Sequence, residues 1–171
     1  MKRMLFIAAL ALSATAQASS DTMKRFENPN YVFEEDKVWE EAAYTVPAYP
    51  NTASWTGFYV PLEQNFDYSI DASTLTLGSD GVLRMIMRAV SKKGAVNLSY
   101  EGLRCDAKTL RVYAFGDTIN HRWIESSKAV WRRLTLDDTA RVRLRSDICP
   151  DGQVPPSAER ALELLKKSPW L

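Results

Sequence analysis

The chain has 171 residues, of which 46% are hydrophobic and 25% are charged, and its net charge is +1. This length fits one domain of common size, and this balance excludes the disordered and low-complexity classes. A near-neutral charge gives no general attraction to nucleic acid or to an anionic membrane, so we expect neither as a partner.

Residues 1–18 have the pattern of a secretory signal peptide. Lys2 and Arg3 supply a positive start, residues 5–12 are apolar, and small residues precede an expected cleavage between Ala18 and Ser19. The apolar run is too short to span a bilayer core of ~30 Å, and no later run approaches transmembrane length. No cysteine lies near the cleavage site to accept a lipid. We therefore expect a soluble, exported protein that works in the periplasm.

Two regions are expected after cleavage. Residues 19–37 are polar and charged, which predicts a flexible N-terminal tether. Residues 38–171 are expected to form a single globular domain. Its first part, 38–44, favours a short helical turn, and Pro47 and Pro50 then favour an extended path.

Alternating apolar and polar residues predict a series of strands. They cover residues 56–62, 66–71, 75–77, 82–90, 96–105 and 110–115. Glycine-containing runs at 78–81 and 91–94 predict turns between them. One face of 82–90 is expected to lie in the core and the other, which carries Arg84 and Arg88, to be partly wet.

The alternation changes phase at Gly102. Leu98 and Tyr100 share one parity, whereas Leu103 and Cys105 have the other. A β-bulge at the glycine and a plain strand end at the glycine both explain the change.

The C-terminal half mixes signals. Trp123 and Ile124 favour a further strand, and residues 137–148 fit either a helix capped by Asp137 or a strand. Residues 158–167 have helical spacing, with Ser157 as the expected N-cap and Pro169 as the stop. The predicted fold class is therefore α+β, an antiparallel β-meander packed with C-terminal helices.

Cys105 and Cys149 are the two cysteines of the chain. In an exported protein, such a pair predicts one disulfide, and two buried free thiols are the alternative. The loop of about 45 residues would contribute roughly 4 kcal/mol in the chain-entropy model.

The residue types offer little for catalysis or cofactors. His121 is the one histidine, so no zinc set is expected, and two carboxylates on one strand, Asp67 and Asp71, are too few for calcium. We expect no metal and no cofactor. Basic residues between Arg122 and Arg145, interleaved with Trp123 and Trp131, fit either a surface for an anionic polymer or the acidic tether, or a solvated face.

Three runs carry a resemblance to a known family: Gly81-Val82-Leu83-Arg84, the run from Asn97 to Cys105 (Asn-Leu-Ser-Tyr-Glu-Gly-Leu-Arg-Cys), and Arg111-Val112-Tyr113-Ala114-Phe115-Gly116. The chain resembles the cryptic neisserial protein-like family of uncharacterised exported bacterial proteins. The resemblance implies a periplasmic location and supplies no catalytic residues. Some members resemble lipoproteins, from which this chain departs because it lacks a cysteine in the signal.

Two functions are weighed for the mature domain. The preferred one is a non-enzymatic module that binds an unknown periplasmic protein or envelope component. Aromatic and charged side chains of the predicted strands would form its surface: Tyr100, Glu101, Arg104, Arg111 and Tyr113. A sheet face covered by the C-terminal helix explains the aromatic residues equally well. The alternative is a hydrolase that uses Glu101 with another carboxylate and Arg104. A structural pairing of Glu101 with Arg104 inside the fold is the third possibility.

Overall fold

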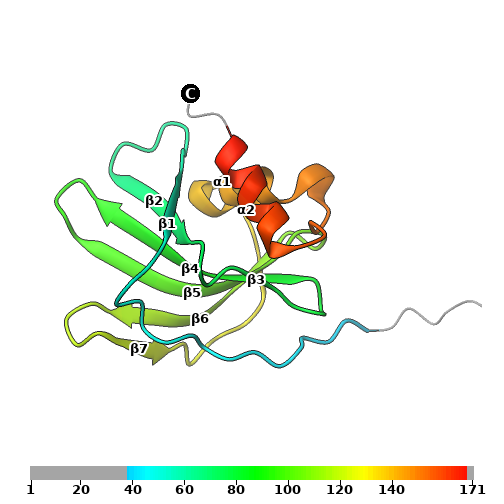
Figure 1. Cartoon of the computed structure of the whole chain (residues 1–171), viewed down its shortest axis with the longest axis horizontal. Coiled ribbons are helices and arrows are strands. Elements are labelled where there is room, and N and C mark those ends of the chain that lie inside the picture. The colour runs from blue at the N-terminus through cyan, green and yellow to red at the C-terminus, as the bar shows by residue number, and fades with distance from the viewer. Residues whose placement is uncertain (1–37, 169–171) are drawn as a thin grey trace, which may run out of the picture. The chain divides into compact units, whose positions relative to one another are not determined.

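The structure is a computed structural model that describes residues 38–168, and its central element is an antiparallel sheet (Figure 1). The strands are β1 (Trp55–Phe58), β2 (Phe66–Asp71), β3 (Thr76–Leu77), β4 (Val82–Ser91), β5 (Val96–Arg104), β6 (Thr109–Asp117), β7 (Arg122–Glu125) and β8 (Arg132–Arg133). Their order is β1-β2-β4-β5-β6-β7, with β3 beside β4 and β8 beside β6. The expected signal peptide (1–18), the tether (19–37) and the stop at Pro169 lie outside the described residues.

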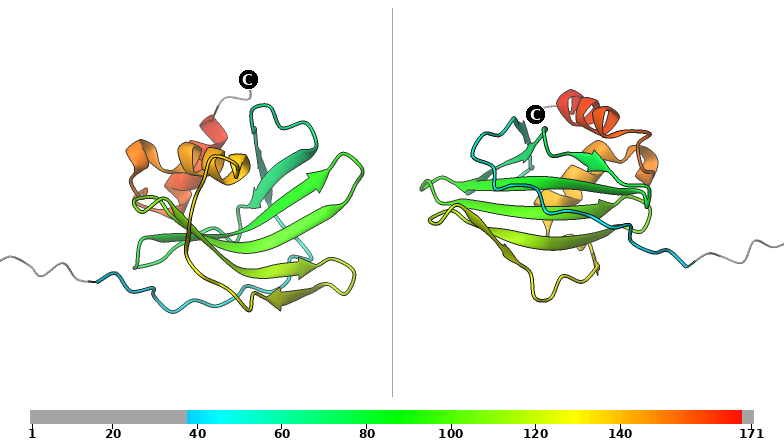
Figure 2. Two further views of the ribbon diagram at one scale, coloured as in Figure 1. Left: turned by 180° about the vertical axis from the view of Figure 1, so that it is seen from behind. Right: turned by 60° about the horizontal axis from the view of Figure 1, so that its bottom comes forward.

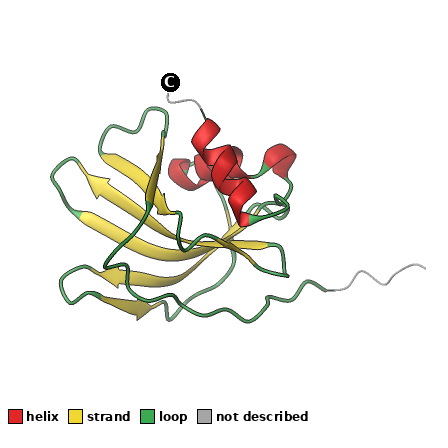
Figure 3. Cartoon of the chain, in the orientation of Figure 1, coloured by secondary structure: helices red, strands yellow, loops and turns green. Residues whose placement is uncertain are grey.

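The helices follow the sheet in the chain, and Figure 3 shows them grouped on one side of the strands. They are α1 (Thr139–Ile148), a 3-10 turn η1 (Pro150–Gly152) and α2 (Ala158–Lys167). The α+β prediction is confirmed, and 137–148 is a helix rather than a strand. Asp138, not Asp137, is the N-cap of α1, whereas the Oγ of Ser157 accepts from the Arg160 amide at 3.2 Å and caps α2 as expected. No helix within 38–168 is long and apolar enough to cross a membrane.

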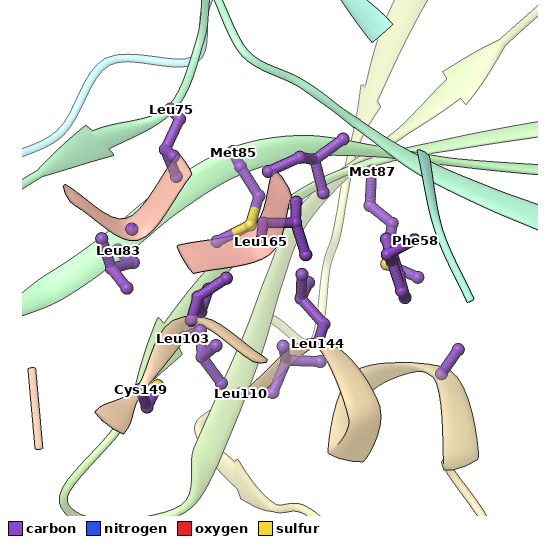
Figure 4. Packing of buried hydrophobic residues seen from close by; sticks show 14 of the residues in the cluster. Phe58, Leu75, Leu83, Met85, Met87, Leu103, Leu110, Leu144, Cys149 and Leu165 are labelled. Carbon is purple, nitrogen blue, oxygen red and sulfur yellow. The ribbon is translucent and has the colours of Figure 1, made fainter. Parts of the chain in front are cut away.

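The two helices bury one face of the sheet. Apolar residues that alternate along β4, β5 and β6 point toward them, and Figure 4 shows how these side chains pack. The cluster includes Leu83, Met85, Met87, Leu103 and Leu110 from the strands and Leu144, Ile148 and Leu165 from the helices. Complete burial of these side chains supplies the main apolar core of the domain.

A disulfide between Cys105 and Cys149 joins this core at one end, with the two Cα atoms 5.6 Å apart. It links the loop after β5 to the residue that follows α1. The predicted pairing is confirmed. The guanidinium of Arg145 donates to the Cys105 carbonyl at 2.9 and 2.5 Å, so α1 is tied to the same loop a second time.

Residues 39–47, which we call the N-terminal segment, cross the other face of the sheet in an extended path (Figure 2). The helical turn expected over 38–44 is therefore wrong, because side-chain contacts with the sheet hold the segment open. These contacts bury the face that was expected to be partly wet: Arg84 is only 4% exposed. Tyr100 and Tyr113 are covered here by the segment and not by a C-terminal helix.

Strand β5 continues through Gly102, which is neither a strand end nor an extra residue. The register between β5 and β6 shifts between Tyr100 and Glu101, where β6 carries the additional residue Tyr113. Glu101 and Leu103 consequently share the helix-covered face. The alternation seemed to change phase at Gly102 because Glu101 is a polar residue that is buried on this otherwise apolar face. The expected strand over 56–62 is also too long, because β1 ends at Phe58.

Candidate functional site

Two arginines lie in one row of the sheet, on the face that the N-terminal segment covers. Arg84 of β4 pairs with Gly102 of β5, and Gly102 pairs with Arg111 of β6. Gly102 has no side chain, and the ring of Tyr113 occupies the space above it: a Cβ built on Gly102 would lie 2.3 Å from the Tyr113 hydroxyl oxygen. The row thus presents two guanidinium groups on either side of a phenol.

Glu41 of the N-terminal segment places its carboxylate on this row. Oε1 accepts from the Tyr113 hydroxyl at 2.5 Å and from Arg84 Nη2 at 3.2 Å. Oε2 accepts from Trp131 Nε1 at 3.0 Å and from Arg111 Nη1. We call these five side chains the Glu41 cluster. Four donors on one carboxylate, two of them cationic, make strong charge-assisted hydrogen bonds.

Asp80 fixes the position of Arg84. Its Oδ2 lies 2.6 Å from Arg84 Nη2 and also accepts from the backbone amide of Ala42 at 2.9 Å. The Asp80 carbonyl accepts from Trp39 Nε1 at 2.9 Å. Asp80 therefore holds both the arginine and the segment that covers it, so the guanidinium is oriented before any ligand contacts it.

The electrostatics of the cluster favour an ionised Glu41. Burial raises the pKa of the Glu41 carboxyl, but hydrogen bonds from Tyr113 and Trp131 and the charge of Arg111 outweigh burial and leave the pKa below its ordinary value. Burial and the bond to Glu41 raise the pKa of the Tyr113 phenol. Tyr113 is thus a neutral donor, and the cluster is built to hold a negative charge.

Aromatic rings surround the two guanidinium groups. Tyr44 packs on Tyr113 with ring centroids 4.2 Å apart, and Arg84 and Arg111 lie 5.5 and 5.8 Å from the Tyr44 centroid. Two hollows of about 390 and 550 Å³ lie beside Tyr44. Arg84 lines the smaller one and Arg111 the larger one. The two hollows therefore give access to the cluster from two sides.

The structure places four of the five residues expected at a site on the face covered by the N-terminal segment: Tyr100, Arg104, Arg111 and Tyr113. The rings of the two tyrosines lie 5.3 Å apart. They do not form an open surface, because Tyr100 is 4% exposed and Tyr113 is 3% exposed. Their exposed neighbour in the site is Tyr44.

Glu101 and Arg104 are not brought together. Glu101 is 1% exposed on the helix-covered face, where it accepts from Arg141 at 2.5 and 2.8 Å and from the Ser99 hydroxyl at 2.5 Å. Arg104 lies on the face covered by the N-terminal segment, where it stacks on Trp39 at 3.8 Å, and the Trp39 ring lies 5.5 Å from that of Trp131 in the Glu41 cluster. The geometry thus gives Glu101 a pairing inside the fold with Arg141 rather than with Arg104. Within residues 38–168, no group of three or more His, Cys, Asp or Glu is placed to hold a metal ion.

The sequence does not indicate Glu41, Asp80 or Arg84 as site residues. Glu41 lies 70 residues from Arg111 and 90 from Trp131, so no local spacing connects it with its donors. The sequence predicts a turn at 78–81, and Asp80 does lie in a turn. Its bonds to Arg84 and to the Ala42 amide depend on the fold and have no signal in the sequence. Trp131 belongs to the basic stretch for which the sequence offered the acidic tether as a partner, but the carboxylate that it binds is Glu41, which follows the tether of 19–37.

Comparison with known proteins places the chain in a family. The model of the CNP1-like family matches residues 34–166. The chain is also similar to "Cryptic neisserial protein 1" of Neisseria gonorrhoeae, at 26% identity over 147 residues that cover 75% of this chain and 72% of the relative. No solved structure matches. Because the family match spans every described element but the end of α2, and the resemblance seen in the sequence agrees with it, the chain belongs to the CNP1-like family.

Proposed function

We propose that this chain is a non-enzymatic binding module of the cell envelope, acting in the periplasm. An extended segment of a partner displaces the N-terminal segment, and its carboxylate takes the place of Glu41 on the four donors of the Glu41 cluster. The main observation in support of this proposal is that four donors converge on the Glu41 carboxylate. Four donors oriented on one position favour the binding of an acidic group. The Cys105–Cys149 disulfide and the signal-like start of the chain support an oxidising compartment.

The N-terminal segment is suited to exchange with such a partner. No backbone-to-backbone hydrogen bond joins residues 39–47 to the sheet, so every hydrogen bond that holds the segment involves a side chain on one side. Its other anchors are the Trp39 and Ala42 bonds to Asp80, and the bond from Trp123 Nε1 to the Pro47 carbonyl at 2.8 Å. A partner segment with a similar carboxylate could therefore replace residues 39–47 without breaking a backbone-to-backbone hydrogen bond to the sheet.

The test uses the full chain and a labelled peptide that copies residues 38–46. In Glu41→Gln, the chain's own segment loses its charge-assisted bonds, and the peptide, which keeps its glutamate, competes for the cluster. We expect the peptide to bind Glu41→Gln at least about tenfold more tightly than the wild type, the equivalent of one charge-assisted hydrogen bond. Fluorescence anisotropy measures the binding.

Two controls make the result specific. Glu40→Gln makes the same chemical change at the exposed neighbouring residue and should bind the peptide like the wild type. A peptide with glutamine in place of its second glutamate should bind neither variant. Equal binding of the two peptides to Glu41→Gln would remove carboxylate recognition from the proposal.

A further inference from the structure

A third hollow, of about 430 Å³, lies on the same face of the sheet but at its β1 end, away from the Glu41 cluster. Gly57, Ser69 and Arg88 form one row across β1, β2 and β4. The two small residues of this row leave space beside the arginine. A volume of this size is typical of sites for small organic ligands. We call it the Trp55 hollow, after the tryptophan that lines it.

Arg88 is the distinctive group of this hollow. Its Nε donates to the Ser69 hydroxyl at 3.0 Å, and its guanidinium carbon lies 4.1 Å from the centroid of the Trp55 ring. No carboxylate among residues 38–168 forms an ion pair with it, in contrast to Arg84, Arg111 and Arg141. Ser69 and Trp55 thus orient a guanidinium whose two terminal nitrogens are left for another acceptor.

The other charged side chains of the hollow already have hydrogen-bond or ion-pair partners. Lys92 Nζ holds Asp67 at the rim, at 2.7 and 2.8 Å from its two oxygens, with both side chains more than half exposed. Glu63 accepts from the backbone amide of Asn65 at 2.7 Å. The carboxylates therefore lie at the rim with partners of their own, and Arg88 is the cation of the hollow that has none.

Two aromatic rings form the wall beside Arg88. Trp55 and Tyr59 line the hollow, the Trp55 ring lies against the guanidinium, and Tyr59 is 37% exposed. Phe66 and Tyr68 alternate with Asp67 and Ser69 along β2, so their side chains belong to the opposite face, where Tyr68 packs against the helix-covered core. Rings of this kind bind flat apolar groups through their faces and edges. A guanidinium beside such a wall fits a ligand with two parts, an anionic group and a flat body.

We propose that the Trp55 hollow is a binding site for a small organic carboxylate with a flat apolar body, the carboxylate on Arg88 and the body against the aromatic wall. This site is independent of the proposed function, because no residue of the Glu41 cluster lines it.

Three probes separate the two parts of the ligand. Benzoate carries both, benzamide keeps the shape without the charge, and acetate keeps the charge without the body. We expect benzoate to shift the indole NMR signal of Trp55 in the full chain, with millimolar affinity, and to bind about tenfold more tightly than either other probe at matched ionic strength. Equal binding of benzamide and benzoate to the unmodified chain would overturn the proposal.

Variants test the residues. Arg88→Gln and Tyr59→Ala should each weaken benzoate about tenfold, whereas Lys93→Gln, which removes a nearby exposed charge outside the hollow, should not. Glu41→Gln should bind benzoate at Trp55 like the wild type, so failure here and failure of the proposed function are distinguishable. Undiminished binding in both Arg88→Gln and Tyr59→Ala would overturn the site.

Discussion

Gly102 lies between two arginines, and the ring of Tyr113 takes the place where a side chain would be. A Cβ there would lie 2.3 Å from the Tyr113 hydroxyl oxygen and 2.9 Å from two ring carbons. We therefore expect Gly102→Ala to lower the free energy of unfolding by about 1–3 kcal/mol, the usual cost of overpacking. Urea denaturation measures this change.

The cost of Gly102→Ala should depend on Tyr113. In a Tyr113→Leu background, the smaller side chain leaves room for the added methyl group, and the same glycine change should cost less. Strict additivity of the two substitutions would show that the glycine acts through something other than this contact.

Glu101 is a deeply buried carboxylate of the helix-covered face, and Arg141 is its ion-pair partner. Removing that partner leaves an uncompensated charge in the core, so Arg141→Ala should lower the free energy of unfolding by about 3 kcal/mol. Arg160→Ala breaks the exposed pair with Glu163 and should cost less than about 1 kcal/mol. Similar values for both variants in equilibrium denaturation would contradict this assignment.

Among the elements, those with regular alternation or helical spacing could be predicted. Strands β2, β4, β5 and β6 and helix α2 appear where the sequence indicates them, because one apolar face of each packs against the same core. The path of residues 39–47 could not be predicted, since it has no ladder and depends on donors far away in the chain. Arg111 and Tyr113 lie on a strand with regular alternation and could therefore be proposed for the site. Glu41 lies in residues 39–47, whose path the sequence does not indicate, and could not.

The disulfide connects an element of the sheet to an element of the helical layer. Cys105 follows β5 and Cys149 follows α1, with a sequence separation of 44 residues. In the chain-entropy model, closing this loop contributes about 4 kcal/mol, so a Cys105→Ser, Cys149→Ser double variant should unfold at a correspondingly lower urea concentration.

Reductant supplies the matched control for the disulfide. It should lower the stability of the wild type toward that of the double serine variant and leave the variant unchanged. Two free thiols in the protein purified without reductant, seen by mass spectrometry, would contradict the bond and the stability prediction together.

At the scale of the whole domain, the Glu41 cluster makes stability depend on pH. The pKa of Glu41 is lower in the folded chain than its unfolded value of ~4.3, so its contribution is present above that value and is lost as pH falls through the folded pKa. We expect Glu41→Gln to be less stable than the wild type near neutral pH, with a difference that shrinks below about pH 4.

Urea denaturation of both proteins at several pH values measures this difference directly, because other titrating groups cancel in the comparison. Glu40→Gln should follow the wild type throughout. A difference between Glu41→Gln and the wild type that stays constant with pH would assign the loss to shape rather than to charge.

The side-chain attachment of the N-terminal segment also has a mechanical consequence. Its anchors follow one another along the chain, from Trp39 to Glu41, Tyr44 and Pro47, whereas the strands of the sheet are joined by ladders of bonds that share a load. Tension applied ahead of residue 39 would therefore break these anchors one at a time and peel the segment from the sheet before any strand separates. A pull of modest force would uncover the two arginines while the rest of the domain stays folded.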